Sequence, residues 1–447
     1  MTPQFFRGDW LVPGSPGYDD ARPVFNLRAD ARPEVIARCA GVSDVVAALR
    51  YAHERGIPID VRCTGVTFGS LTAGTGVVID LSPMRAVEIL PGERIARVQG
   101  GIRGVDLQIE AAVHGLAATT GIVSRTGTGA WLAGGISHLT PSAGFACDNI
   151  LAVEIVTAAG SVVRASPEEN PDLFWAVRGT TGNFGVVTAL EVRLHDMPPI
   201  VHAGTMSWSY DRLDAPIRAL RDRGGASDDL AVLALLGTAA NGGRGGLDLI
   251  VCHSGSPEDA KSDLDRLRAA GTPDEETVCA LPFLELCTMF DDGYPPMRAA
   301  MDEQSVGELT DELVAALVEK VREPATGAAR SFELVPRYGA MCAAPPHPGA
   351  WRESAVAPSF GVGPTAFWED PAADAANVRW VADAIGTVRQ VGTVAGDDHP
   401  GSVGTARDLD GLRGLYGDRL DRLRTLKRAW DPGNVFTGSH NIPPAEA

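Results

Sequence analysis

The chain has 447 residues, of which 45% are hydrophobic and 21% are charged. These proportions are typical of a soluble globular protein with room for two or three domains, and they exclude collagen-like, coiled-coil and wholly disordered chains. Acidic residues outnumber basic residues by 57 to 39, and the net charge of −18 would repel nucleic acids and anionic membrane surfaces.

Cysteine usage and the N-terminus indicate the compartment. The seven cysteines are scattered and form no C-x-x-C pair, which favours a reducing environment. The first residues, MTPQFFRGDW, lack the basic and apolar regions of a secretion signal, and no segment reaches the ~18 apolar residues of a membrane span. We therefore expect a cytoplasmic protein with no membrane partner. None of the nine histidines has metal-ligand spacing, so no metal site is expected.

The first 200 residues alternate helical and strand-like patterns. Ser43 is a candidate cap for a helix over residues 44–55, and Gly56 is a candidate left-handed stop. Further patterns predict strands at 57–62, 76–82 and 184–195, hairpins at 86–101 and 150–166, and a helix at 105–115. The region reads as mixed α+β.

A second α+β unit is predicted from about residue 200 to 400. Residues 230–237 and 247–255 are apolar strand candidates, and residues 308–321 and 372–388 have the pattern of amphipathic helices. The run 343–358, rich in alanine and proline, is expected to be a surface loop or lid. A long helix is predicted over 410–430, ending at Asp431, Pro432 and Gly433.

Three glycine-rich segments, at residues 61–70, 120–135 and 178–188, suggest a cofactor site. Glycine lets backbone N–H groups converge on an anion, so such loops can hold a diphosphate without a lysine. None has the GK[ST] of a Walker loop or the spacing of a Rossmann fingerprint. Each segment alone is compatible with an ordinary tight turn, but together they favour a bound cofactor.

A long ordered series of segments carries a family resemblance: RPEVIARCAGVSDVVAALRYAHERGIPIDVR, GVVIDLS, ARVQGG, HGLAATTG, TGTG, ACDNI, ENPDLFWAVRGTTGNFGVVT and WDPGNVFTGSHNIPP. This series resembles FAD-linked oxidases of the vanillyl-alcohol oxidase / p-cresol methylhydroxylase (PCMH) fold, and the berberine-bridge-enzyme-like branch is the most similar. The resemblance covers roughly residues 20–200 and 405–447 strongly and the middle weakly.

The resemblance implies an α+β fold with a two-lobed PCMH-type FAD-binding domain and a substrate domain whose antiparallel sheet is flanked by helices. The implied boundaries are 1–200 for the N-terminal part of the FAD-binding domain, 201–404 for the substrate domain and 405–447 for the C-terminal return. It also implies an oxidoreductase of secondary metabolism that acts on a bulky small molecule, with O₂ as the usual oxidant. The net negative charge gives no reason to expect a nucleic-acid partner.

The resemblance further implies which residues contact FAD. The loop around the pyrophosphate would contain Arg62, Cys63, Thr64, Gly65, Val66, Thr67 and Phe68, and the ribityl side would be formed by Val123, Ser124, Thr126, Gly127 and Gly129. The adenine edge would lie near Gly182, Asn183, Gly185 and Val187, with Asn441 beside the ring.

The chain departs from the family where flavin is usually tethered. Val66 stands where relatives carry the histidine of RGGGHS, and Val123 aligns with the cysteine of bicovalent members. Valine has no nucleophile, so FAD is expected to bind noncovalently. Cys63 is read as a small buried side chain rather than a substitute tether.

The family's usual proton acceptor is also missing. The stretch GDDHPGSVG at 396–404 lacks the tyrosine of the Tyr-x-Asn pair, and Met301–Gln304 replaces an aromatic patch of the substrate domain. The candidates that remain for catalysis are Asp398, His399 and His138, while His347, Tyr338 and Tyr294 are weaker.

Two further functions are compatible with these losses. A cyclase or pericyclase could use the roofed cavity with structural or lost flavin, because holding a substrate in a reactive pose accelerates a reaction without any base. A binding protein with no chemistry is the third alternative.

Overall fold

In the computed structural model, the described residues are 2–67, 75–180, 182–222, 227–238, 245–269, 271–325, 327–395, 400, 408–438 and 440–446. The residues Phe68, Asp398 and His399, which the sequence puts forward for the site, lie outside this part of the chain. No helix among the described residues is long and apolar enough to cross a bilayer.

The first sheet combines parallel and antiparallel pairing in the order β1-β2-β4-β3. Its strands are β1 (Asp9–Leu11), β2 (Val35–Arg38), β3 (Ile59–Arg62) and β4 (Val77–Asp80), with the short helix α1 (Tyr18–Ala21) after β1. Helix α2 (Val42–Arg55) ends at Gly56, whose φ of 63° is left-handed, as the sequence predicts. The expected cap is wrong: Ser43 makes no capping bond, and the Asp44 carboxylate instead accepts bonds from the N–H groups of Arg7, Gly8 and Ala40.

A five-stranded antiparallel sheet follows in the order β5-β6-β10-β8-β9. Its strands are β5 (Val87–Leu90), β6 (Ile95–Gln99), β8 (Ile150–Val156), β9 (Val162–Ala165) and β10 (Val186–Arg193), while β7 (Leu116–Ala117) pairs with β11 (His195–Asp196). The hairpins predicted at 86–101 and 150–166 are confirmed. The helices of this region are α3 (Gly104–Ala112), α4 (Thr128–Leu132), α5 (Thr140–Ala143) and α6 (Pro171–Val177).

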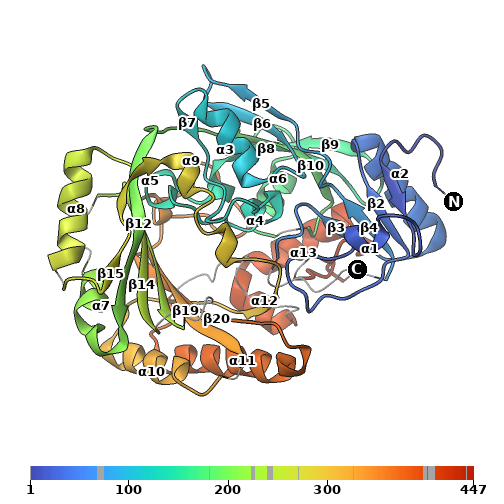
Figure 1. Cartoon of the computed structure of the whole chain (residues 1–447). Coiled ribbons are helices and arrows are strands. Elements are labelled where there is room, and N and C mark those ends of the chain that lie inside the picture. The colour runs from blue at the N-terminus through green and yellow to red at the C-terminus, as the bar shows by residue number, and fades with distance from the viewer. Residues whose placement is uncertain are drawn as a thin grey trace.

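A nine-stranded sheet forms the second lobe, with the order β15-β12-β14-β13-β19-β20-β17, β16 beside β12 and β18 beside β20. Its strands are β12 (Ile200–Ser209), β13 (Leu230–Gly237), β14 (Gly246–His253), β15 (Glu275–Glu276), β16 (Cys279–Pro282), β17 (Arg298–Met301), β18 (Gln304–Val306), β19 (Ala328–Arg337) and β20 (Ser359–Trp368). Its helices are α7 (Asp214–Arg221), α8 (Pro257–Ala269), α9 (Phe283–Leu286), α10 (Asp311–Val321) and α11 (Asp374–Val391). Figure 1 shows α10 and α11 along one side of β19 and β20, facing away from the N-terminal lobe.

The chain returns to the N-terminal lobe in α12 (Leu409–Tyr416) and α13 (Arg419–Trp430), whose buried leucines join the core of the five-stranded sheet. The single helix expected over 410–430 is therefore wrong. It is interrupted at Gly417, whose φ of 55° with ψ of −136° no helix can contain. The α+β, two-lobed architecture is confirmed, while the domain boundaries stay predictions.

Candidate active site

A cavity of about 380 Å³ is lined by residues of both lobes. Its volume lies within the ~300–1,000 Å³ range of small-molecule sites. Most residues expected at FAD line this main cavity: Arg62, Cys63, Thr64, Gly65, Val66, Thr67, Val123, Thr126, Gly127, Gly129, Gly182, Gly185 and Val187. Ser124, Asn183 and Asn441 lie outside its lining. The wall thus brings together segments that are far apart in the sequence, as a dinucleotide requires.

Close backbone approach supports the fit of FAD to this wall. A Cβ added at Gly127 would lie 2.5 Å from Cγ2 of Thr64, so only glycine lets these two loops meet. Gly182 has a left-handed φ of 71°, and a Cβ added there would lie 3.5 Å from Cα of Gly438, so the third glycine-rich loop also approaches another segment through its main chain. The cradle is therefore built from main chain, which suits a flat, anionic nucleotide.

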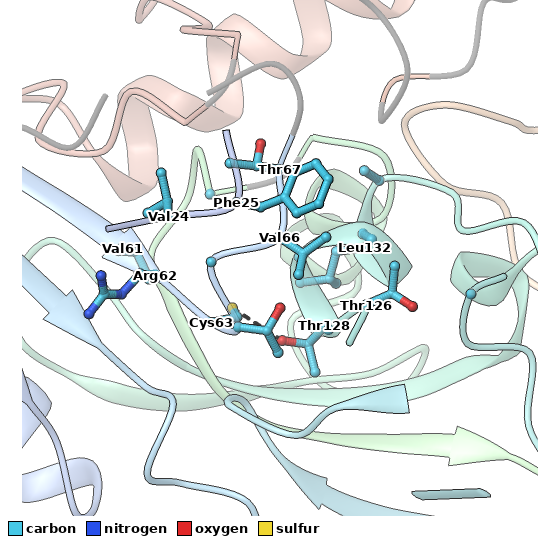
Figure 2. A pocket seen from close by; sticks show the side chains of 18 of the residues that line it. Val24, Phe25, Val61, Arg62, Cys63, Val66, Thr67, Thr126, Thr128 and Leu132 are labelled. Carbon is cyan, nitrogen blue, oxygen red and sulfur yellow. Dashed lines mark hydrogen bonds between the residues drawn. The ribbon is translucent and has the colours of Figure 1, made fainter. Parts of the chain in front are cut away.

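Three arginines line the same cavity, and their partners differ. Arg62 donates to the Asp80 carboxylate at 2.6 Å. Figure 2 shows its side chain pointing away from Cys63 and Val66. Arg22 is paired with Asp30. Arg125, which the sequence analysis missed, donates to the carbonyl of Tyr294, and its Nε is buried without a partner among the described residues. Arg125 is therefore a cation that could hold an anionic part of FAD.

Val66 and Val123, which the sequence analysis aligns with the family's flavin tethers, carry no nucleophile. Val66 packs against a cluster that contains Phe25 and Phe367, and Figure 2 shows Val66 beside Phe25. The Cys63 thiol accepts a hydrogen bond from Thr128 Oγ1 at 3.3 Å, and burial raises its pKa. Since the thiolate is the nucleophilic form, Cys63 is poorly suited to bond a flavin.

Asn183 and Asn441, which were expected near the cofactor, lie outside the lining of the main cavity. The Asn183 amide donates to the His440 carbonyl at 3.0 Å and accepts from the N–H of Ile442 at 3.0 Å. Asn183 therefore holds the C-terminal segment in place, and His440 of that segment lines the main cavity. The Oδ1 atom of Asn441 is buried and has no hydrogen-bond partner among the described residues.

The opposite wall comes from the inner face of the nine-stranded sheet. Along β19 the side chains alternate: Phe332 and Leu334 are buried in the outer core, while Glu333 and Val335 line the main cavity. Gly363 pairs with Glu333 on β20 and adds no side chain beside it. Glu333 was missed by the sequence analysis, although a carboxylate inside the apolar run SFELV is the signal that could have found it.

Glu333 has an unusual proton affinity. Burial, together with the Glu303 carboxylate, raises its pKa to about 7. Tyr294 also lines the cavity, and its pKa is raised by burial and by the negative charge of Glu333. A carboxyl group that titrates near neutral pH can accept and release protons there, while the tyrosine stays protonated.

His138 lies outside the main cavity. It lines a small chamber of about 20 Å³, and Ile122, Ile136, Leu233 and Val335 line both spaces. Burial lowers the pKa of His138 to about 4, although a hydrogen bond to the Ile122 main chain acts in the opposite direction. Its Nε2 has no hydrogen-bond partner among the described residues. His138 is therefore neutral and separated from the main cavity by apolar side chains.

The weaker candidates also differ in position. Tyr338 is buried and donates its hydroxyl to the Leu230 carbonyl, and His347 lies with its ring centroid 6.3 Å from that of Phe174. Neither lines the main cavity, whereas Tyr294 does. In the described part of the chain, no group of three or more histidine, cysteine or acidic side chains could hold a metal ion.

Comparisons with known proteins agree with this geometry. A family model of the FAD binding domain matches residues 33–166, and a model described as berberine and berberine like matches residues 412–443. The (R)-6-hydroxynicotine oxidase of Paenarthrobacter nicotinovorans is 31% identical over 457 residues, covering 99% of this chain and 98% of that protein.

Solved structures match over the whole chain. The 6-hydroxy-D-nicotine oxidase of Arthrobacter nicotinovorans superposes with a TM-score of 0.87 at 29% identity and covers 100% of both chains. The BBE-like 1 protein of Physcomitrella patens gives a TM-score of 0.86 at 22% identity, covering 99% of this chain and 98% of that one, which supports the fold alone.

Proposed function

The chain belongs to the FAD-linked oxidoreductases of the berberine-bridge-enzyme-like branch of the PCMH-type fold, and on this premise we propose that it holds FAD without a covalent bond and oxidises a bulky small molecule. The observation that carries the proposal is the main cavity itself. It has a main-chain cradle on one wall and a carboxyl group poised near neutral pH on the other.

The first wall would bind the cofactor through the glycine-rich loops, with Arg125 as the cation for an anionic part of it. When bound, FAD supplies the acceptor for a hydride from a substrate C–H bond. Noncovalent binding is supported by Val66 and Val123 at the tether positions and by the protonated, hydrogen-bonded thiol of Cys63.

The second wall would orient the substrate and take up its proton. Glu333 can accept the proton of the N–H or O–H group next to the reacting carbon, since its pKa lies close to neutral pH. Tyr294, which stays protonated, can donate a hydrogen bond to the same region. Leu233, Met301 and Val335 supply an apolar surface that excludes water.

The sequence also left open a cyclase with structural or lost flavin. That alternative drew its support from the apparent loss of every base, and Glu333 weakens this support. We propose O₂ as the oxidant that regenerates the cofactor, which oxygen consumption during turnover would test.

Acid precipitation of the purified protein tests the binding mode. We expect intact FAD in the supernatant and none in the pellet. Flavin that remains with the precipitated wild-type protein would contradict noncovalent binding. Anaerobic bleaching of the bound flavin by a substrate then separates redox chemistry from cyclisation, because a cyclase would leave the absorbance unchanged while product forms.

Val66→His supplies the nucleophile that relatives have at this position, so a fraction of the flavin is expected to stay with the pellet after acid treatment. Cys63→Ser is the control: because the thiol is bonded to Thr128, its loss should leave release complete. Complete release from Val66→His would mean that this side chain does not reach the ring.

A further inference from the structure

The substrate wall carries one carboxylate more than its neighbouring cations neutralise. Glu303 forms an ion pair with Arg337, whose Nη1 also donates to Ser305 Oγ at 2.6 Å. Glu333 forms no ion pair with any described residue, although the Glu303 charge acts on it. Arg337 is therefore committed to Glu303, and Glu333 has no cation of its own among the described residues.

The surroundings of Glu333 make an unpaired charge costly. Leu233 and Val335 are its apolar neighbours in the cavity lining, and Gly363 contributes no side chain. A carboxylate held in such surroundings is destabilised unless a partner charge or a hydrogen-bond donor reaches it. In the protein without ligand, this free-energy cost of the charged form appears as the raised pKa of Glu333.

The other cations of the cavity do not offset this charge. Arg22 and Arg62 are paired with Asp30 and Asp80, and Arg125 is directed at the main chain of Tyr294. Burial and Glu303 raise the pKa of Glu333, and no basic group in the described chain counteracts them. Since the described residues supply no partner for this charge, a ligand is the natural candidate to supply it.

We propose that the substrate is an amine that enters as an ammonium ion and pairs with the Glu333 carboxylate. This inference rests on the proposed function and names its substrate class. The carbon skeleton of the amine would lie against Leu233, Met301 and Val335, whose side chains offer no polar group. An anionic substrate would be repelled, and a neutral alcohol would leave the charge of Glu333 unpaired.

The same pair accounts for the proton. An ammonium nitrogen has no lone pair, so a proton must leave before a hydride can depart from the adjacent carbon. One N–H bond breaks, its proton forms an O–H bond on the Glu333 carboxylate, and the electron pair stays on nitrogen. Loss of the hydride then leaves the substrate as a protonated imine, and the proton on Glu333 is released to solvent after product leaves.

Three probes of one shape test the charge preference: naphthylmethylamine, naphthylmethanol and naphthoate. Their affinities for the FAD-loaded protein are measured by calorimetry at about pH 8, where the probe amine, like a lysine, is protonated. We expect the amine to bind roughly ten- to a hundredfold more tightly than the alcohol, the range for a hydrogen bond to a charged group. Naphthoate should bind more weakly still.

Glu333→Gln should abolish the preference for the amine, while Glu333→Asp should retain part of it. Glu312→Gln is the control, because it removes one carboxylate from the exposed face of α10 without approaching the cavity. Equal affinities of amine and alcohol, including no detectable binding of either, would overturn the proposal, as would an unchanged preference in Glu333→Gln.

The binding measurement tests the ammonium site separately from the redox function, because it does not require turnover. If the amine preference depends on Glu333 but no amine bleaches the flavin anaerobically, the ammonium site stands and the redox function fails. If an alcohol bleaches the flavin and binds better than its amine, the redox function stands and the ammonium site fails.

Discussion

His138 is a buried histidine whose proton affinity is far from that of an exposed imidazole. Its pKa is about 4 in the folded protein, against 6.5 for the ordinary side chain. Between these pH values the unfolded chain binds a proton that the native protein does not, so stability falls as the pH is lowered from 6.5 towards 4. Below that window both states are protonated and this contribution changes no further.

Replacement of His138 by phenylalanine should therefore reduce the acid sensitivity of the fold. The stability that this residue loses across the window is about 3 kcal/mol. Urea unfolding of the wild type and His138→Phe at several pH values measures it. The exposed His114, changed to phenylalanine, is the control and should leave the pH dependence intact. Parallel curves for wild type and His138→Phe would disprove a buried neutral imidazole.

Single residues also show how far the sequence could predict the site. The loop residues from Arg62 to Thr67 follow from a contiguous motif, and the structure brings them to one cavity. Glu333 could not be predicted in the same way, because its strand was not recognised from the sequence. Its raised pKa also depends on burial and on Glu303, which lies in the turn between β17 and β18. The commitment of Arg337 to Glu303 is equally a product of tertiary packing.

At the scale of elements, the end of α13 carries a buried clamp. The Lys427 ammonium lies 2.7 Å from the Asp431 carboxylate, with both side chains fully buried, and also donates to the carbonyls of Asn183 and Phe436. Asp431 accepts from the N–H groups of Val435 and Phe436. The clamp therefore sets the path of the segment that contributes Phe436, Thr437 and Gly438 to the main cavity.

Lys427→Met would leave the Asp431 carboxylate buried without its cation, so we expect the free energy of unfolding to fall by about 3–5 kcal/mol. FAD affinity should fall with it, because the displaced segment lines the cofactor cavity. Denaturant unfolding and flavin fluorescence titration measure the two effects.

The matched control is Lys261→Met. Lys261 and Asp265 have the same i,i+4 spacing on α8 and a similar separation of 2.6 Å, but both are exposed. Such a pair contributes under about 1 kcal/mol. If the two lysine variants lose the same stability, burial of the Lys427 pair is not what matters.

Amphipathic periodicity predicted α2, α10 and α11 well, because each has a clear apolar face and a recognisable start or end. It failed at Gly417, since the pattern of leucines continues across the break and only the backbone reveals it. The strands β19 and β20 were missed for a related reason: both faces are largely buried, so the alternation of polar and apolar residues is weak.

At the scale of the whole molecule, the two lobes are joined by the connection between β19 and β20. Residues 343–358 were expected to be a surface loop or lid. The run is a loop and residues 353–358 are exposed, as expected, but residues 349–352 are buried. Trp351 is 2% exposed and its ring lies 4.7 Å from that of Phe145, while the Arg352 guanidinium pairs with the buried Asp148. The centre of the run packs into the N-terminal lobe because it contains a large aromatic side chain and a paired arginine. The sequence analysis missed this contact because the proline content of the run suggested an exposed loop.

This contact should make the lobes unfold together. Trp351→Ala removes the largest side chain of the connection, at a cost of about 3–5 kcal/mol, and we expect the single calorimetric transition to split into two. Trp208→Ala, which also removes a buried tryptophan but within the second lobe alone, should lower the transition temperature without splitting it. A single transition in Trp351→Ala would show that other contacts join the lobes, such as Asn26 with Ala299.

The bond between Asn183 and the carbonyl of His440 spans 257 positions. A ribosome adding roughly 5–20 residues per second needs about 13–50 s to travel that distance. During this interval the glycine-rich loops of the N-terminal lobe have been synthesised, but the C-terminal segment around His440, which lines the same cavity, has not. We therefore expect flavin to load only after translation is complete, and we expect a chain whose synthesis stops before His440 to lose flavin affinity although it carries both lobes.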